Sequence, residues 1–209
     1  MTPRFVLATA NPDKAREIAA VLRATGLDVE LVPRPVDVPD VDETGDTLED
    51  NARLKAEALC RATGLPAISD DTGLEVDALD GAPRVQSARY AGEDASYADN
   101  VALLLEQLAG APPAARRARF ATVAIACWPD GHEVAAFGEV TGAIATTPRG
   151  DAGFGYDPVF VPDEGDGRTF AEMSPEQKHD LSHRGRAFRT LADGLRIDAA
   201  LAKRAERME

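Results

Sequence analysis

The chain has 209 residues, of which 44% are hydrophobic and 28% are charged, a composition that is ordinary for a soluble globular protein. Its length suits one well-packed core, so residues 1–209 are predicted to form a single domain. The net charge of −13 argues against general binding to DNA, RNA or anionic membranes, because these partners need a basic surface. A locally positive pocket can still bind a small anionic substrate.

The cysteines and the hydropathy pattern favour a cytoplasmic protein. Cys60 and Cys127 are isolated in the sequence and lack the spacing of a metal site, as expected in a reducing compartment. No signal peptide is recognisable, and no apolar run approaches the roughly 18 residues of a membrane span. We therefore expect a cytoplasmic protein that does not act in a membrane.

The chain begins with a predicted strand, a tight turn and a helix. The strand covers the apolar residues 5–8, and the helix starts at Pro12 and stops at Gly26. The turn that joins them presents unpaired backbone N–H groups and a positive helix end, which together suit a phosphate. This candidate phosphate site is Thr9-Ala10-Asn11-Pro12-Asp13-Lys14. The alternative is a surface helix capped by Asn11, with a solvated Lys14.

A second strand is predicted over residues 29–32, followed by a loop over residues 33–46. Acidic residues cluster in this loop, where they are either solvated or available to a hard cation. They are Asp37, Asp40, Asp42 and Glu43.

The next helix is predicted from Thr47, which forms a capping box with Asp50, to about Ala62. Asn51 and Lys55 are one turn apart on this helix and therefore share a face.

A short buried strand over Pro66–Ile68 is predicted to end at the acidic stretch Ser69-Asp70-Asp71-Thr72-Gly73, with Leu74–Val76 as a separate short strand beyond it. Ligands of α/β proteins bind at the carboxyl ends of strands. Two neighbouring aspartates repel each other, and a cation between them relieves that cost. The alternative is a turn that is merely rich in aspartate.

The second half of the chain is predicted to contain a long loop, a helix, a hairpin and a further strand. The loop covers residues 81–94, the helix 99–108, the two strands of the hairpin 119–128 and 133–145, and the further strand 159–161.

A glycine-rich stretch precedes the last of these strands. Its glycines would let the backbone approach a planar ligand while Phe154 or Tyr156 stacks on it. Two helices then begin at Ser174-Pro175 and at Ser182-His183. Alone, Lys178 could be a solvated lysine and His183 a helix cap.

Taken together, these motifs resemble one family, the non-canonical purine nucleoside triphosphate pyrophosphatases of the inosine/xanthosine triphosphatase (Ham1-like) type. They occur in the family's order from residue 4 to about residue 196. The matching pieces are Thr9-Ala10-Asn11-x-x-Lys14, Glu43-Thr44-Gly45, Glu49-Asp50-Asn51-Ala52-x-x-Lys55-Ala56, Ser69-Asp70-Asp71-Thr72-Gly73-Leu74, Ser87-Ala88-Arg89-Tyr90, Gly153-Phe154-Gly155-Tyr156-Asp157-Pro158 and Ser182-His183-Arg184-Gly185. Two positions depart from the family pattern: Ala10, where glycine is frequent, and Asp50, where glutamate is commoner.

The resemblance implies an α/β fold, in which an elongated mixed β-sheet with flanking helices forms two lobes around a central nucleotide-binding cleft. It also implies a homodimer. The implied reaction is the Mg²⁺-dependent hydrolysis of ITP, dITP or XTP to the monophosphate and pyrophosphate, which cleanses the nucleotide pool.

The resemblance assigns roles to single residues. Asp71 would be a metal ligand and the base that takes a proton from water, and Glu43 would be the second metal ligand. Asp70 would support the site, with Asp40 and Asp42 as alternatives to Glu43. The residues expected to contact the phosphates are Thr9, Ala10, Asn11, Pro12, Asp13, Lys14, Lys55 and Thr72.

The base is expected to lie against Phe154, Gly155, Tyr156 and Asp157. Its edge would be read by Lys178, His183 and Arg184. Hydrogen-bond donors at these positions would pair with the 6-oxo group of hypoxanthine or xanthine. They could not form a hydrogen bond with the 6-amino group of adenine, which is itself a donor.

Two other functions stay open at this point. One is a related Maf-like pyrophosphatase that acts on modified pyrimidine nucleotides, which relative rates on ITP and on UTP or dTTP would separate. The other is a nucleotide-binding regulator without turnover, although the set of Asp71, Glu43 and Lys14 argues against it.

Overall fold

The computed structural model describes residues 2–206 and divides the chain into two compact units. Unit 1 comprises the residues up to Asp71, Val123–Gly138 and the residues from Ala187 on. Unit 2 comprises Thr72–Thr122 and Glu139–Arg186. The chain passes from unit 1 to unit 2 first at the peptide bond between Asp71 and Thr72 and again between Gly138 and Glu139.

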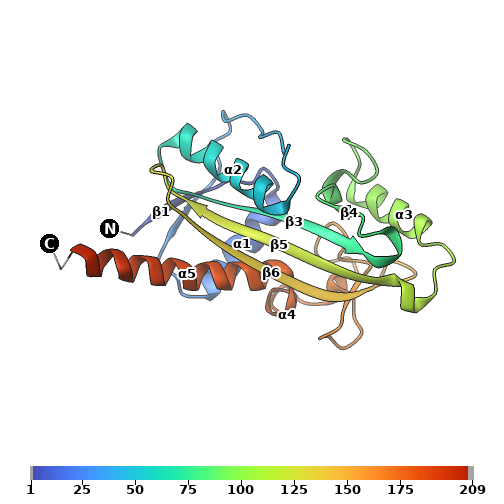
Figure 1. The fold of residues 1–209 in the computed structure, drawn as a ribbon. Coiled ribbons are helices and arrows are strands. Elements are labelled where there is room, and N and C mark those ends of the chain that lie inside the picture. The colour runs from blue at the N-terminus through green and yellow to red at the C-terminus, as the bar shows by residue number, and fades with distance from the viewer. Residues whose placement is uncertain (1, 207–209) are drawn as a thin grey trace. The chain divides into compact units, whose positions relative to one another are not determined.

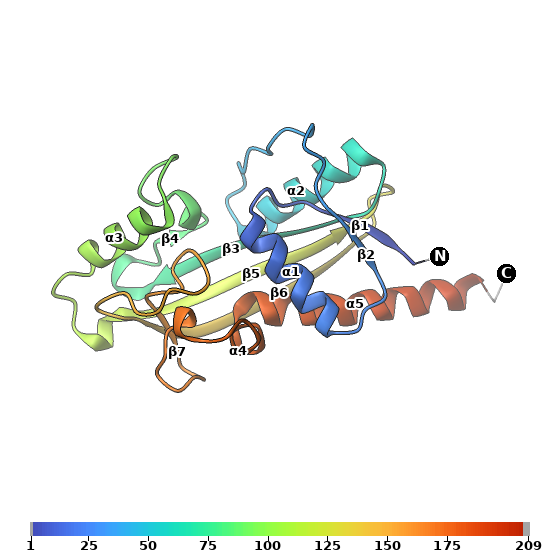
Figure 2. The ribbon, with the colours of Figure 1, turned by 180° about the vertical axis from the view of Figure 1, so that it is seen from behind.

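The strands form a mixed sheet in the order β2-β1-β3-β5-β6-β7, and β4 pairs with β3 (Figure 1 and Figure 2). β1 runs parallel to β2 and β3, whereas the pairs β3–β4 and β6–β7 are antiparallel. The predicted mixed sheet with flanking helices is thus confirmed. The strands are β1 (Arg4–Leu7), β2 (Glu30–Val32), β3 (Ala67–Val76), β4 (Pro83–Arg84), β5 (Arg117–Cys127), β6 (Glu133–Ile144) and β7 (Phe160–Pro162).

Unit 1 has helices on both faces of its part of the sheet. The core on one face joins α1 (Pro12–Ala24) and the later part of α5 (His183–Glu206), and the core on the other face joins α2 (Leu48–Thr63). Figure 2 shows α1 and α5 in front of the strands, with α2 behind them. The two cores draw on alternate strand residues: Ile68 packs with α1, and Ala67 packs with α2.

Unit 2 has a separate core that contains the helix α3 (Tyr97–Gln107) and an aromatic group formed by Phe120, Phe160 and Phe170. The short helix α4 (Pro175–Leu181) also belongs to this unit. Four 3₁₀ helices complete the described elements: Asp77–Leu79, Ser87–Arg89, Pro113–Arg116 and Phe170–Glu172.

The predicted helix starts are largely confirmed by the cap geometry. Asn11 caps α1, Thr47 caps α2, and Ser174 forms a complete capping box with Gln177 at α4. The predicted start of α3 at Asp99 was wrong. The N-cap is Ser96, which exchanges hydrogen bonds with Asp99 in a capping box, so the helix begins at Tyr97.

The prediction that the acidic stretch ends a strand was also wrong. β3 continues from Ala67 through Asp70 and Asp71 to Val76. Successive side chains of a strand point to opposite faces. The two carboxylates therefore point to opposite faces of the sheet, where Asp70 pairs with Lys14 and Asp71 pairs with Lys55. Because the carboxylates are separated and each has a cationic partner, their repulsion does not interrupt the strand.

Among residues 2–206, we find no helix whose length and apolar character would let it span a bilayer.

The α5 core contact can be tested by replacing Leu191, which is fully buried, with alanine. Leu191→Ala is expected to lower the free energy of unfolding by about 2–5 kcal/mol, because the lost side chain leaves a cavity. The neighbouring residue Thr190 is exposed, and Thr190→Ala should change the free energy of unfolding by less than about 0.5 kcal/mol. Urea denaturation followed by circular dichroism measures both, and equal midpoints for the two variants would contradict this packing.

Candidate active site

The residues predicted to act on a nucleotide fall into two sets, one in each unit. Unit 1 holds the turn before α1, the acidic loop before α2, Lys55 and the two aspartates of β3. Unit 2 holds Thr72, the glycine-rich loop, Lys178, His183 and Arg184. The two sets adjoin in the chain at Asp71 and Thr72.

The turn between β1 and α1 is held by the side chain of Asn11. Asn11 Oδ1 accepts hydrogen bonds from the backbone N–H groups of Asp13 at 2.9 Å and Lys14 at 3.2 Å. The Asn11 N–H donates to Thr9 Oγ1 at 3.2 Å. The backbone N–H groups of Asn11, Asp13 and Lys14 are therefore already paired, which reduces the number of unpaired amides that the turn can offer.

Lys55 connects the helix α2 to the acidic loop and to β3. Its Nζ donates to Asp71 Oδ1 at 2.9 Å and to Glu43 Oε1 at 2.7 Å. The side chains of Lys55 and Asp71 are only 11% and 6% exposed, so this contact is largely withdrawn from water. Lys55 thus brings together two carboxylates that are twelve and sixteen residues away from it in the chain.

The second aspartate of β3 has a different partner. Asp70 Oδ2 lies 3.6 Å from the Nζ of Lys14, which comes from the first turn of α1, and the Asp70 side chain is fully buried. Ser69, on the same face as Asp71, donates from Oγ to the carbonyl oxygen of Ala52 in α2 at 2.6 Å. The alternation along β3 therefore assigns Asp70 to α1 and Asp71 to α2.

Burial and charge shift the titration of this group. Burial raises the pKa of the Asp71 carboxyl above its ordinary value, and the ammonium groups of Lys55 and Lys14 oppose that shift. Burial alone would lower the pKa of Lys55, but the negative charges of Asp71, Glu43 and Asp70 outweigh it, so the net shift is upward. Lys55 is therefore held in its charged form.

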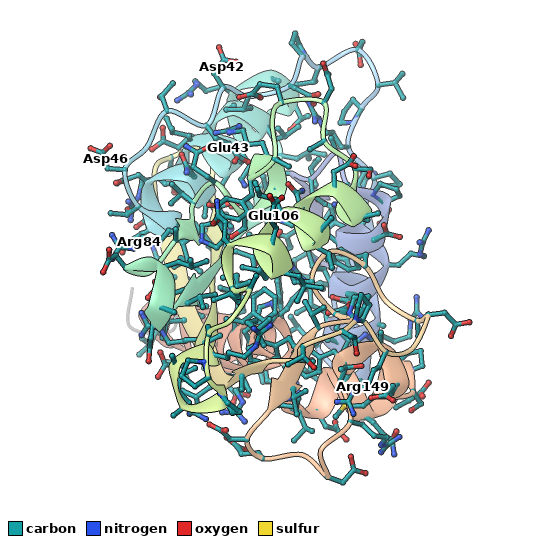
Figure 3. The ribbon with its side chains drawn as sticks, turned by 90° about the vertical axis from the view of Figure 1, so that its right-hand side faces the viewer. Asp42, Glu43, Asp46, Arg84, Glu106 and Arg149 are labelled. Atoms are coloured by element: carbon teal, nitrogen blue, oxygen red, sulfur yellow. The ribbon has the colours of Figure 1, made fainter. Side chains whose placement is uncertain are left out.

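The acidic loop contributes one carboxylate to this group. Asp40 pairs with Arg34 at 2.5 Å, and Asp42 and Asp46 are exposed. Figure 3 shows Asp42 and Asp46 at the outer margin of the view and Glu43 further in. Of the three candidates for a second metal ligand, Glu43 is the one bonded to Lys55.

The carboxylates of unit 1 suit a hard divalent cation. Asp71 Oδ2 is buried and accepts no hydrogen bond from any described residue, while Asp71 Oδ1 and Glu43 Oε1 both accept from Lys55. Within residues 2–206, no three His, Cys, Asp or Glu side chains are grouped to hold a metal by themselves. Mg²⁺ usually binds through one or two carboxylates, waters and substrate phosphates, so the pair Asp71 and Glu43 fits it.

A cavity of about 930 Å³ lies next to the turn and is lined by Thr9 and Ala10, parts of α1 and the segment after β2. Neither Asp71 nor Lys55 lines it, and its walls are mainly apolar. The cavity is therefore distinct from the group of charged residues around Asp71.

In unit 2, the glycine-rich loop presents the ring of Phe154. Asp157 Oδ2 accepts from the Phe154 N–H at 2.8 Å and from Lys178 Nζ at 2.5 Å. Gly153 has φ +73°, and a Cβ there would collide with the Asp157 carboxylate. The loop therefore depends on a buried ion pair between Asp157 and Lys178 that only glycine at residue 153 accommodates.

Two cations lie at the Phe154 ring. Lys178 Nζ is 4.8 Å and Arg184 Cζ is 5.4 Å from the ring centroid, both within the range of cation–π attraction. Tyr156 points elsewhere: it is 4% exposed, packs in the core of unit 2, and donates from its hydroxyl to the Ser87 carbonyl. Phe154 is thus the loop aromatic that retains exposed surface.

His183 and Arg184 open α5 as buried polar residues with defined contacts. The His183 imidazole stacks on Phe120 with a centroid distance of 4.4 Å and an interplanar angle of 16°. Arg184 Nη2 donates to Thr72 Oγ1 at 3.1 Å, and Thr72 Oγ1 lies 2.7 Å from Thr122 Oγ1. Arg184 therefore contacts both Thr72 and the Phe154 ring.

Three residues of this region were missed from the sequence: Tyr97, Phe120 and Thr122. Phe120 and Thr122 sit in an apolar strand pattern and carry no local signal of function. Tyr97 had one, because the Ser96-x-x-Asp99 spacing marks a helix start directly before it. Its ring lies beside Phe154, with 5.8 Å between the ring centroids.

Comparison with known proteins gives consistent results. Residues 5–194 match the model of the Ham1 family. A Streptomyces avermitilis protein named dITP/XTP pyrophosphatase is 49% identical over 195 residues, which are 92% of this chain and 97% of that protein. A Geobacter sulfurreducens protein of the same name is 48% identical over 195 residues, covering 92% of this chain and 96% of the relative.

Solved structures agree with the sequence comparison. A HAM1 protein from Coxiella burnetii superposes with a TM-score of 0.83 at 39% identity, covering 92% of this chain and 98% of that one. A nucleoside-triphosphatase (dITP/XTP pyrophosphatase) from Mycobacterium abscessus has a TM-score of 0.70 at 46% identity, with 90% and 97% coverage. With a family model matched over nearly its whole length and relatives this similar, the chain belongs to the Ham1 family.

Proposed function

We propose that this protein is a pyrophosphatase that hydrolyses the non-canonical purine nucleotides ITP, dITP and XTP, with Mg²⁺, to the monophosphate and pyrophosphate. Relatives that are nearly half identical over 92% of the chain are named dITP/XTP pyrophosphatases. The observation that carries the proposal is Asp71, a buried carboxylate on β3 with one oxygen on Lys55 and the other without a partner among the described residues.

The residues of unit 1 would act on the phosphates. Mg²⁺, held by Asp71 and Glu43, would neutralise charge on the triphosphate. Asp71 would take the proton from the water that attacks the α-phosphorus, and the bond between the α-phosphorus and the bridging oxygen would break to release pyrophosphate. Lys14 and Lys55 would balance the phosphate charge, and Lys55 would also fix the orientation of the Asp71 carboxylate.

The residues of unit 2 would bind the base. The Phe154 ring offers a flat apolar surface, and Lys178, His183 and Arg184 bring hydrogen-bond donors to the same unit. A 6-oxo purine would accept from these donors, whereas the 6-amino group of adenine would leave a buried donor unpaired. Such a mismatch can cost several powers of ten in kcat/KM, on the order of 10⁴.

Two further aspects of the proposal rest on the family resemblance. The protein would act in the cytoplasm on free nucleotides and not on nucleic acid, for which its net charge of −13 is also unfavourable. It would form a homodimer.

A nucleotide panel tests the reaction directly. With Mg²⁺, the protein is expected to release pyrophosphate and monophosphate from ITP, dITP and XTP much faster than from ATP, UTP or dTTP. Pyrophosphate and orthophosphate are assayed separately, with and without EDTA. Release of orthophosphate in place of pyrophosphate would contradict the reaction, and undiminished turnover in EDTA would contradict the metal requirement.

The role of Asp71 is tested by Asp71→Asn, which keeps the size of the side chain but removes a basic carboxylate. We expect a loss of at least about a hundredfold in kcat, as is typical for a general base, with a folded protein by circular dichroism. The matched control is Asp46→Asn, which removes an exposed carboxylate from the same loop as Glu43 and should leave kcat unchanged. Near-normal turnover by Asp71→Asn would remove Asp71 from its proposed role.

A further inference from the structure

Tyr97 places a second aromatic ring beside the one proposed to bind the base. The ring centroids of Tyr97 and Phe154 are 5.8 Å apart and the rings are inclined by 40°, a geometry within the range of favourable aromatic pairs. Tyr97 is 41% exposed, and Phe154 is also only partly buried. The pair therefore presents aromatic surface that a ligand can reach.

The backbone at Tyr97 is well anchored. Tyr97 is the first residue of α3, directly after the N-cap Ser96, whose backbone and side chain both bond to Asp99. One turn on, the buried Asn100 donates to the Ala88 carbonyl at 3.0 Å and accepts from the Ala91 N–H at 2.8 Å. The start of α3 is thus tied to the preceding loop, and Tyr97 offers Phe154 a fixed neighbour.

Phe154 stands between two glycines, which have no side chains to pack against its ring. The loop consists largely of glycine and small residues around Phe154, with φ +73° at Gly153 and φ +62° at Gly155. The ring also contacts two cations, Lys178 and Arg184. Cations attract the ring but are themselves the proposed readers of the base. Tyr97 supplies an aromatic contact that is not itself one of the proposed readers of the base.

Tyr97 lies outside the described buried core of unit 2. The described core cluster of that unit contains the aromatic residues Phe120, Tyr156, Phe160 and Phe170, with Tyr90 packed against it, and Tyr97 is not part of it. Tyr97 combines 41% exposure with a contact to a candidate ligand-binding ring, so its side chain is placed where it can affect the binding of a ligand.

We propose that Tyr97 is a positioning residue for the base: its ring orients Phe154 and so sets the affinity for the purine. The inference rests on the proposed function, because it concerns the binding of that substrate. It assigns Tyr97 no part in the attack on phosphorus, so the effect of its removal should fall on substrate binding.

The experiment compares Tyr97→Ala and Tyr97→Phe by steady-state kinetics on ITP. Tyr97→Ala is expected to raise KM about tenfold, in line with the loss of an aromatic contact, and to change kcat less than about twofold. Tyr97→Phe keeps the ring and should recover most of the affinity. Isothermal titration of IMP without metal should show the same loss and recovery in Kd, in a measurement that needs no turnover.

The matched control is Phe137→Ala, which removes an aromatic ring of similar exposure, 51%, from unit 1 and should leave KM and kcat unchanged. An unaltered KM and Kd in Tyr97→Ala would overturn the inference, and so would an equal loss in Tyr97→Phe, which would assign the effect to the hydroxyl. A lower kcat with unchanged KM would also overturn it. Failure of the wild-type protein to turn over ITP would instead count against the proposed function, while the IMP titration still decides the role of Tyr97.

Discussion

The candidate site of unit 1 depends on one buried ammonium group. Lys55 extends from α2 and donates to Glu43 of the acidic loop and to Asp71 of β3. A buried ion pair gains little for stability, because desolvation of both charges offsets most of their attraction, but loss of one partner leaves an uncompensated buried charge. The value of Lys55 is therefore in geometry: it connects three segments and orients the Asp71 carboxylate.

In unit 2, a buried ion pair likewise positions a side chain of the candidate site, here the Phe154 ring instead of the Asp71 carboxylate. Asp157 pairs with Lys178 and also holds the Phe154 N–H, so the ring and one of the cations over it are positioned by the same carboxylate. Arg184 contacts the ring from the first turn of α5 and bonds to Thr72, the neighbour of Asp71 in the chain. In each unit, buried polar groups that bond to one another fix the side chains that remain available to a ligand.

The sequence predicted the framework of this molecule better than its details. Local signals identified the helix caps at Asn11, Thr47 and Ser174, because cap chemistry is a property of three or four adjacent residues. The continuation of β3 through Asp70 and Asp71 was not predictable in this way. Aspartate is unfavourable in strands, and only the lysines of α1 and α2, distant in the chain, make it acceptable there.

The site residues show the same limit. Motif spacing brought Lys55, Glu43 and Asp71 to attention, and the structure shows them in contact. Motif spacing could not predict that Tyr156 is buried in the core while Phe154 stays partly exposed, since both are aromatic residues of one loop. Which of two such rings is buried depends on the hydrogen bond to Ser87 and on the packing of the whole unit.

The charges in the unit 1 site also bear on how substrate and metal would bind together. Glu43, Asp70 and Asp71 are paired with two ammonium groups, Lys14 and Lys55, so these five side chains carry one excess negative charge when all of them are ionised. A triphosphate alone would be repelled by it, and a divalent cation alone would lack the phosphate oxygens that complete its coordination. Each would bind better in the presence of the other, and by thermodynamic linkage the nucleotide would strengthen metal binding by the same factor as the metal strengthens nucleotide binding. Under the proposed function, the excess carboxylate would thus make the site responsive to the metal–nucleotide complex rather than to either component.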